Sequence, residues 1–229
     1  MHYKIIFLII SSDNEPVYAQ MREILPKYLN LYFDKIQYFF IECNSEQSEE
    51  VVEKDHYLYC KGVDSTIPGI FHKTMKSMNY LDNHYSCDFV VRTNLSTFWH
   101  MDNLLKLVNT LPTQGYAGGF CFAKDYLSGT TMIFSSDVIQ RLIPYSQDSR
   151  ALLINDDVAI SIFLHDEKIP IQPVKNYSWD YTGSLQIIQP DHNVDNVLNF
   201  RIKNQNNDRK LDVINFKILL QKIYGITFP

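Results

Sequence analysis

Apolar and polar segments alternate along the whole chain, and their lengths indicate strands and helices that follow one another in turn. Short apolar runs between polar residues are typical of buried strands, whereas apolar residues three or four positions apart are typical of helices. Strands are predicted over residues 3–10, 35–42, 56–60, 87–91, 116–122, 127–134 and 169–174. Helices are predicted over residues 67–81, 101–111, 136–142, 155–164 and 211–224, with another starting near Pro16.

This alternation predicts an α/β fold in which a central, mostly parallel sheet carries helices on both faces. A length of 229 residues suits one domain, and no internal repeat or linker divides the chain. We therefore expect a single domain over residues 1–229. Residues 184–209 are polar and rich in Asn and Asp, so they are predicted to form a long loop.

Composition and charge exclude several classes of function. The net charge of −5 and the isoelectric point near 5.8 provide no electrostatic footprint for nucleic acid. The cysteines are isolated in sequence, which favours buried thiols in a reducing compartment over a disulfide framework or a zinc site. They are Cys43, Cys60, Cys87 and Cys121.

The apolar run at residues 3–10 is too short for a membrane span, and no small-residue cleavage site follows it. A buried first strand explains this run better than a signal sequence. No other apolar run is long enough to span a bilayer, so we expect a cytoplasmic protein without a membrane anchor. The oligomeric state is not readable from the sequence.

Four stretches that follow predicted strands or begin predicted helices contain the residues with the clearest chemistry. They read D-S-T-I-P-G-I-F-H-K-T from Asp64, R-T-N-L-S-T-F from Arg92, L-S-G-T-T-M-I-F-S from Leu127 and N-D-D-V-A-I from Asn155. Their order and spacing resemble the β-1,3-glycosyltransferases, a family of galactosyl-, N-acetylglucosaminyl- and fringe-type enzymes. The family motifs are D-S-Y-x-N-L-T-L-K-T, F-V-L-K-T-D-D-D-V-F, C-S-G-T-G-Y-V-F-S, and E-D-V or D-D-V.

The resemblance implies a GT-A-like, Rossmann-like fold and a nucleotide-sugar-dependent hexosyltransferase. Such an enzyme moves a sugar from a donor, here expected to be UDP-linked, to a hydroxyl of a glycan or glycosylated acceptor with inversion. Most members of the family are anchored in the Golgi, and the predicted absence of an anchor is a departure from that pattern.

The acidic pair at the start of the predicted helix 155–164 is the candidate catalytic group. A carboxylate at a helix N-terminus is stabilised in its ionised form, as a general base must be. By the resemblance, Asp157, directly before Val158, would be the base that deprotonates the acceptor, and Asp156 would support it or orient the acceptor. The alternative interpretation is ordinary helix capping by Asn155 and its acidic neighbours.

The family's acidic triplet is replaced here by Asn94-Leu95-Ser96. Mn²⁺ and Mg²⁺ prefer anionic oxygen ligands, so the neutral Asn94 and Ser96 disfavour a metal site and instead suggest hydrogen bonds to the donor. His192 is the only late histidine and has no supporting motif, so no metal ligand is predicted.

A donor diphosphate held without metal needs another source of positive charge. The candidates are Lys73, Arg92, Arg201, Lys203 and Arg209. Arg201 and Lys203 are the most suggestive because they lie in the late polar loop. Residues 184–229 are therefore expected to form a lid over the donor, although surface charges solvated by water are an equally ordinary interpretation.

Further ligand contacts are predicted from position. Ser11, Ser12 and Asp13 follow the first strand, at the sheet edge where ligands bind in open α/β folds, so they are expected to contact the donor. By the resemblance, Ser128 and Gly129 would lie near the acceptor, with the glycine allowing close approach. Trp179 would stack on a sugar or pack in an aromatic cluster.

Two other classes of function remain open. A degenerate transferase that binds a nucleotide sugar or glycan without turnover is favoured by loss of the acidic triplet and disfavoured by retention of Asp156 and Asp157. A hydrolase that uses the two aspartates is weaker, because adjacent residues at a helix start point apart.

Overall fold

The computed structural model describes residues 1–13, 15–123, 125–174, 187–189, 193–204 and 209–228, and the backbone of residues 178–180. The chain forms two compact units. Unit 1 comprises Met1–Ser12, Asp34–Asn94 and Leu111–Val174, and unit 2 comprises Asp13–Phe33, Leu95–Thr110 and Lys175–Pro229. That residues 1–229 act as one domain stays a prediction.

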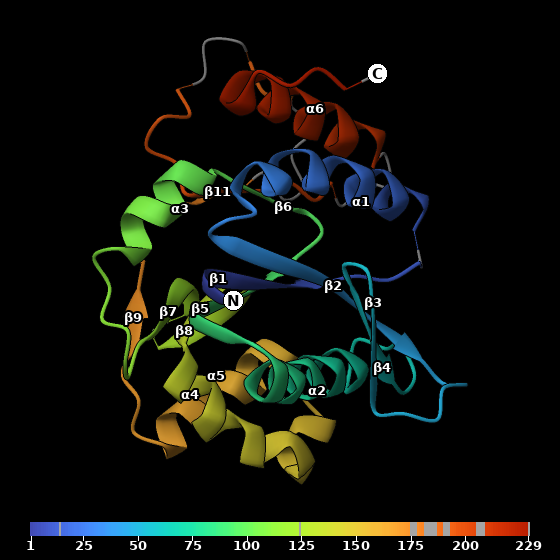
Figure 1. The fold of residues 1–229 in the computed structure, drawn as a ribbon, viewed down its shortest axis with the longest axis vertical. Coiled ribbons are helices and arrows are strands. Elements are labelled where there is room, and N and C mark those ends of the chain that lie inside the picture. Colours follow the sequence, from blue (N-terminus) through green and yellow to red (C-terminus); the bar gives the residue numbers. More distant parts are fainter. Residues whose placement is uncertain are drawn as a thin grey trace. The chain divides into compact units, whose positions relative to one another are not determined.

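Unit 1 is built on an eight-stranded sheet with the order β3-β4-β2-β1-β5-β8-β7-β9 (Figure 1). β1, β2, β4, β5, β7 and β9 run in one direction, and β3 and β8 run in the other. The prediction of an α/β fold with a central, mostly parallel sheet is therefore confirmed. The strands are β1 (His2–Ile10), β2 (Ile36–Asn44), β3 (Val51–Lys54), β4 (Tyr57–Lys61), β5 (Ser86–Asn94), β7 (Ala117–Ala123), β8 (Tyr126–Ser135) and β9 (Ile171–Pro173).

The first strand lies in the middle of this sheet, which explains its continuous apolar sequence. Residues 5–9 of β1 are at most 2% exposed, and β1 pairs in parallel with β2 on one side and β5 on the other. A parallel strand buried on both faces needs apolar side chains at every position, not at alternate ones. The prediction of a buried strand at residues 3–10 is confirmed.

Three helices of unit 1 contact one another and lie on one face of the sheet (Figure 1). They are α2 (Gly69–His84), α4 (Ser136–Leu142) and α5 (Asp156–Asp166), with two 3₁₀ turns, η2 (Ile143–Gln147) and η3 (Ser149–Leu152), between α4 and α5. Phe71 of α2 meets Phe163 of α5 edge to face, with ring centroids 5.8 Å apart. This apolar core fixes where α5 begins relative to the strands.

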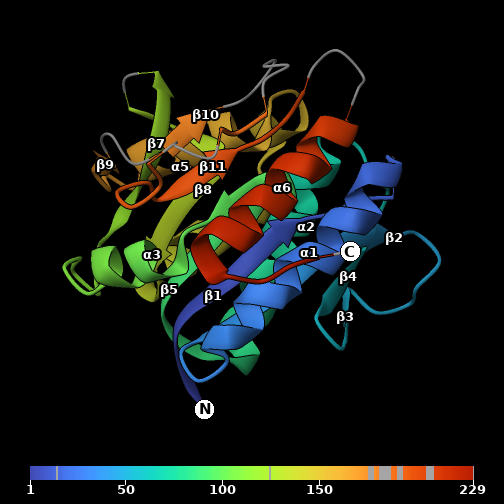
Figure 2. The ribbon, with the colours of Figure 1, turned by 90° about the horizontal axis from the view of Figure 1, so that it is seen from above.

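Unit 2 contains helices α1 (Pro16–Leu29), α3 (Met101–Val108) and α6 (Lys210–Tyr224), and the 3₁₀ turn η1 (Asn30–Tyr32). α1 and α6 lie side by side (Figure 2), and Tyr28 stacks on Tyr224 with ring centroids 4.8 Å apart. A three-stranded sheet joins β10 (Ser178–Asp180), β11 (Asn199–Arg201) and β6 (Thr97–Trp99) in the order β10-β11-β6.

Three expectations need correction. Residues 184–209 are not loop throughout, because β11 pairs there with β10 and β6. Asn155 occupies the N-cap position of α5, but its side chain makes no capping hydrogen bond. Of the four cysteines, only Cys60 is buried, and burial raises the pKa of its thiol to about 11. The other three are half-buried.

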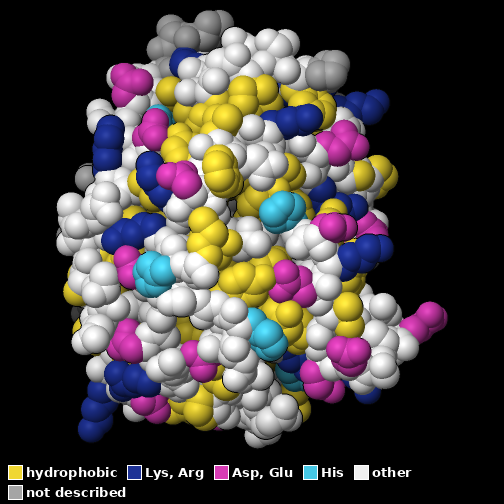
Figure 3. Space-filling view, in the orientation of Figure 1, with side chains coloured by type: hydrophobic (Ala, Val, Ile, Leu, Met, Phe, Trp, Pro, Cys, Tyr) yellow, Lys and Arg dark blue, Asp and Glu magenta, His cyan; other side chains and the backbone are white. Residues whose placement is uncertain are grey.

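The surface and the helices bear on two further expectations. No helix in the described part of the chain is long and apolar enough to cross a membrane. Figure 3 shows acidic and basic side chains interspersed on one face of the molecule.

Candidate active site

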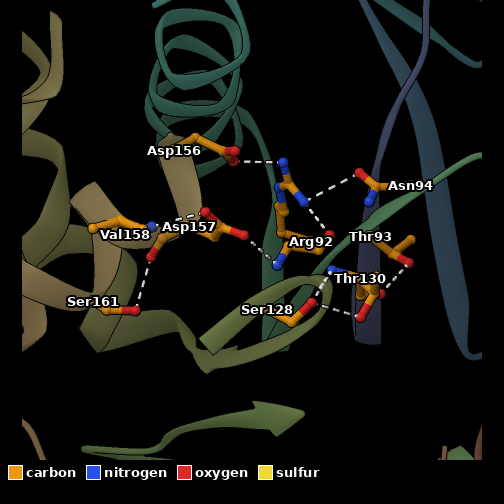
Figure 4. A network of polar contacts seen from close by, with 10 residues as sticks. Arg92, Thr93, Asn94, Ser128, Thr130, Asp156, Asp157, Val158 and Ser161 are labelled. Carbon is orange, nitrogen blue, oxygen red and sulfur yellow. Dashed lines mark hydrogen bonds and ion pairs between the residues drawn. The ribbon is translucent and has the colours of Figure 1, made fainter. Parts of the chain in front are cut away.

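The carboxylate of Asp157 lies between the start of α5 and the start of β8 (Figure 4). One oxygen, Oδ1, accepts a hydrogen bond from the backbone N–H of Val158 at 2.9 Å. The other, Oδ2, accepts from the backbone N–H of Gly129 at 3.2 Å. These two bonds fix the direction of the carboxylate, and Asp157 as a whole is half-buried.

Ser161, one turn further along α5, holds the same two elements together. Its hydroxyl donates to the carbonyl of Asp157 at 2.8 Å and accepts from the backbone N–H of Leu127 at 3.0 Å. The start of β8 is therefore bound to α5 through Leu127 and again through Gly129. The bond to the Asp157 carbonyl fixes the backbone of Asp157, in addition to the bonds that its side chain makes.

Asp156 forms a buried ion pair with Arg92 of β5 (Figure 4). Its Oδ2 lies 2.5 Å from Nη2 of Arg92, and the two side chains are 9% and 2% exposed. Burial raises the pKa of the Asp156 carboxyl, and the charge of Arg92 opposes that shift. Nη1 of Arg92 also donates to the carbonyl of Gly129 and, at 3.2 Å, to Oδ1 of Asn94.

Adjacent in sequence, Asp156 and Asp157 contact different partners. Asp156 faces Arg92 on β5, whereas Asp157 faces the backbone of β8 and of its own helix. Figure 4 shows the two carboxylates turned toward these separate groups. A hydrolase would need both carboxylates to flank one bond, and this arrangement does not favour it.

The predicted acceptor residue Ser128 belongs to a short hydroxyl network beside this pair. Its Oγ lies 3.0 Å from Oγ1 of Thr130, and the Thr130 carbonyl accepts from Oγ1 of Thr93 at 2.7 Å. Ser128 is half-buried, and Gly129 next to it is buried against Arg92. The side chain of Trp179 and the whole of His192 lie outside the described residues.

The residues in place of the acidic triplet do not fit a divalent cation. Oδ1 of Asn94 accepts from the Arg92 guanidinium at 3.2 Å, and in unit 2 Oγ of Ser96 accepts from Nη1 of Arg201. Both oxygens are neutral and each faces a positive charge, whereas Mn²⁺ and Mg²⁺ prefer anionic oxygens. Nor do three His, Cys, Asp or Glu side chains cluster as metal ligands anywhere among the described residues.

Ser11, which follows β1, and Lys73 of α2 lie in one polar network at the carboxyl end of β1 in unit 1. Nζ of Lys73 donates to Oδ1 of Asp64 at 2.8 Å and to the carbonyl of Ser11 at 2.7 Å, and the lysine side chain is 1% exposed. Oγ of Ser11 donates to Glu42 at 2.6 Å. Because Asp64 neutralises Lys73 in a buried position, the geometry favours a structural role for this lysine over contact with a diphosphate.

The next two predicted donor contacts are more accessible than Ser11. Ser12 is half-buried, and in unit 2 the side chain of Asp13 is 79% exposed and pairs with Arg22. The contacts that Glu42, Asp64 and Arg22 make with Ser11, Lys73 and Asp13 were not predicted from the sequence. A signal was present for Asp64 alone, which stands at the head of a family-like motif.

Unit 2 gathers three cations near the start of α6. Arg209 is neutralised by Glu15, at 2.6 Å, and by Asp212. Asp212 also accepts from the backbone N–H of Asn204 at 3.0 Å, which holds the segment after β11 against α6. Lys203 is half-buried, and the carboxylates of Glu15 and Asp212 raise its pKa. Burial and the charges of Arg201 and Arg209 lower its pKa by more than these carboxylates raise it.

No family model and no curated protein sequence matches the chain. Several solved structures, in contrast, are similar to the chain. A glycosyltransferase involved in glycosylation of the major capsid of PBCV-1 is 9% identical over 94% of this chain and 99% of its own, with a TM-score of 0.53. A galactosyltransferase, LgtC, in complex with donor and acceptor sugar analogs is 11% identical over 100% of this chain and 97% of its own, also at 0.53.

A third structure is the Drosophila β-1,4-galactosyltransferase 7, a mutant in complex with manganese, UDP-Gal and xylobiose. It is 9% identical over 92% of this chain and 79% of its own, with a TM-score of 0.50. Likenesses at this level of identity establish a fold and not an activity. The protein therefore has the GT-A-like fold that these glycosyltransferases share, as the sequence motifs predicted.

Proposed function

We propose that the protein is a glycosyltransferase that moves a hexose from a UDP-linked donor to a hydroxyl of a glycan or glycosylated acceptor. Two of the structurally similar proteins were solved with a UDP-sugar or with donor and acceptor sugar analogs. The observation that carries the proposal is the position of Asp157, held at the start of α5 by two backbone N–H groups and still partly accessible.

Asp157 acts in this proposal as the general base. It takes the proton from the acceptor hydroxyl as that oxygen forms a bond to the anomeric carbon of the donor sugar. The bond from the anomeric carbon to the diphosphate oxygen breaks, and the nucleoside diphosphate leaves with the electron pair. Inversion at the anomeric carbon follows from this single displacement, and it is taken from the resemblance to the β-1,3-glycosyltransferases. Ser128 would contact the acceptor, beside the base.

Asp156 and Arg92 position the base in this mechanism and do not react. The Arg92 guanidinium binds Asp156, the carbonyl of Gly129 and the side chain of Asn94. Its positive charge is therefore neutralised within the protein by Asp156. The Asp156–Arg92 pair fixes the first turn of α5 against β5 and β8. The position of Asp157, which belongs to that turn, depends on this contact. This role differs from the expected contact between Arg92 and the donor diphosphate.

Within unit 2, Lys203 and Arg201 remain the candidates that the sequence offers for binding the donor diphosphate. Lys203 is the better candidate, because it is half-buried and the carboxylates that act on it, Glu15 and Asp212, are ion-paired with Arg209. An anion that binds there would relieve the repulsion from Arg201 and Arg209. Donor binding that does not depend on a divalent metal follows, because Asn94 and Ser96 offer only neutral oxygens that already face guanidinium groups.

One specific observation favours a second candidate function, a module that binds a nucleotide sugar or glycan without turnover. The acidic triplet is replaced, and the replacing side chains are engaged with arginines. The presence of the fixed Asp157 favours the enzyme, since a binding module does not need a base.

A screen of nucleotide sugars by thermal shift, followed by calorimetric titration with and without EDTA, tests the donor part of the proposal. We expect UDP and a UDP-sugar to bind with the same dissociation constant in both conditions. The absence of heat with every nucleotide would contradict both candidates. Detection of a glycosylated product by mass spectrometry then separates the enzyme from the binding module.

A further inference from the structure

Three ring side chains form a row on the surface of unit 1. The ring of Phe122, on β7, lies 6.2 Å from that of Tyr126, on β8, and the two are tilted by 44°. Tyr126 in turn meets the imidazole of His165, on α5, edge to face at 5.6 Å and 82°. Phe122 is 53% exposed, Tyr126 is half-buried and His165 is exposed. None of the three belongs to the apolar core of the unit.

The row continues into the candidate active site along β8. Tyr126 lies by His165 at the end of α5, Leu127 binds Ser161 in the middle, and Gly129 binds Asp157 at its start. The first residues of β8 thus follow α5 back toward its N-terminus. Gly129 is three positions after Tyr126 along the strand, a distance of roughly 10 Å. Partly exposed Ser128 lies between them.

We propose that Phe122, Tyr126 and His165 form a stacking subsite for a sugar of an oligosaccharide acceptor, beyond the sugar whose hydroxyl reacts at Asp157. The inference rests on the proposed function. A pyranose ring presents apolar C–H faces and a polar rim. Aromatic side chains match that pattern, because the ring face is apolar while the Tyr126 hydroxyl and the His165 nitrogens supply polar partners at the edge.

The separation from Asp157 determines what the subsite recognises. A monosaccharide at the base would not reach a row roughly 10 Å away along β8, whereas a longer acceptor would span both. The row should therefore select for acceptor length and leave the chemistry and the donor unaffected. The chemical class of the acceptor is then an oligosaccharide or an extended glycan, in preference to a single sugar or a small aglycone.

Acceptor kinetics with Phe122→Ala test the inference. Tetrasaccharides of glucose, galactose, xylose and N-acetylglucosamine would be compared with the matching monosaccharides. We expect the KM for an active tetrasaccharide to rise about tenfold, while kcat, the donor KM and the monosaccharide KM stay unchanged. Phe33→Ala is the matched control, because Phe33 is also a phenylalanine, is 72% exposed and lies in unit 2. An equal effect on short and long acceptors, or none, overturns the inference.

A binding measurement without donor separates this inference from the proposed function. Saturation-transfer NMR would detect tetrasaccharide bound to the wild type and lost in Phe122→Ala. Binding of this kind without turnover would retain the subsite and reject the transferase, whereas turnover without an effect of Phe122 would do the reverse. Failure of every tetrasaccharide to bind overturns the subsite. Self-association that disappears in Phe122→Ala, seen by light scattering, also overturns it by assigning the row to a second copy of the chain.

Discussion

Gly129 lies directly against the guanidinium of Arg92, and a Cβ atom at position 129 would come within 2.4 Å of Nη1. The same nitrogen donates to the carbonyl of Gly129, and the N–H of Gly129 donates to Asp157. One residue without a side chain thus connects the buried ion pair to the candidate base. Its missing Cβ leaves room for the arginine.

Gly129→Ala should displace Arg92 and weaken its contact with Asp156. We expect a loss of about 1–3 kcal/mol in the free energy of unfolding, the usual cost of excess volume in a packed site, together with lower turnover. Urea denaturation measures the first effect. Ser128→Ala is the control, with an expected change of about 0.5 kcal/mol or less. A Gly129→Ala protein as stable as the wild type would show that the close contact is not required.

The sequence predicted the long elements of this fold because their signals are local. Helix α4 was predicted at residues 136–142 and is found at Ser136–Leu142, and the helix predicted to start near Pro16 is found as α1, Pro16–Leu29. β11 was missed because it has three residues, Asn199–Arg201, and exists through pairing with β10 and β6. Such a strand depends on partners distant in sequence, which no local pattern contains.

The candidate site shows the same limit at the level of single charges. Arg92 and Asp156 were both identified as site residues, but they are 64 positions apart and their contact was not predicted. Lys73 was likewise expected to be available for a phosphate, whereas Asp64 binds it in the folded chain. A residue type and a motif indicate which charges are present. Only the fold determines which of them neutralise one another.

Removal of one partner from the buried pair should be strongly destabilising. Arg92→Met leaves Asp156 buried without its counter-charge, and such changes cost about 3–5 kcal/mol. The double variant Arg92→Met/Asp156→Leu should recover part of that loss, because no unpaired charge remains. Chemical denaturation of both single variants and the double variant gives the coupling between them.

The exposed pair of Arg141 and Glu167 is the control for this experiment. Its side chains are 42% and 32% exposed and 3.1 Å apart, so Arg141→Met should cost about 1 kcal/mol or less. Equal losses for Arg92→Met and Arg141→Met would contradict the structural role given to the buried pair.

Asp157→Asn should abolish most turnover and leave donor binding intact. The amide is nearly the same size as the carboxylate, but it cannot take a proton from the acceptor. We expect kcat to fall by roughly 10²–10⁴, while calorimetry gives an unchanged dissociation constant for the donor. Asp166→Asn, at the other end of the same helix and 39% exposed, should leave kcat unchanged. If Asp157→Asn turns over at the wild-type rate, Asp157 is not the base.

The charge of Lys203 makes donor affinity depend on pH in a specific direction. Burial and the nearby arginines lower its pKa below the ordinary value of 10.5, and only the protonated ammonium attracts a diphosphate. Affinity should therefore be complete well below that lowered pKa and should fall as the pH rises through it. Bound anion favours the protonated form, so binding in this range should also take up a proton.

Calorimetric titration with UDP from pH 7 to about pH 10 compares the wild type with Lys203→Arg. A guanidinium stays protonated throughout this range, so the variant should lose the part of the pH dependence that belongs to Lys203. Titration of UDP itself is common to both proteins and cancels in the ratio of their dissociation constants. Lys203→Gln should bind UDP weakly at every pH. A constant ratio of wild-type to Lys203→Arg affinity across the range would remove Lys203 from the donor site, because its titration would then have no effect on the ligand.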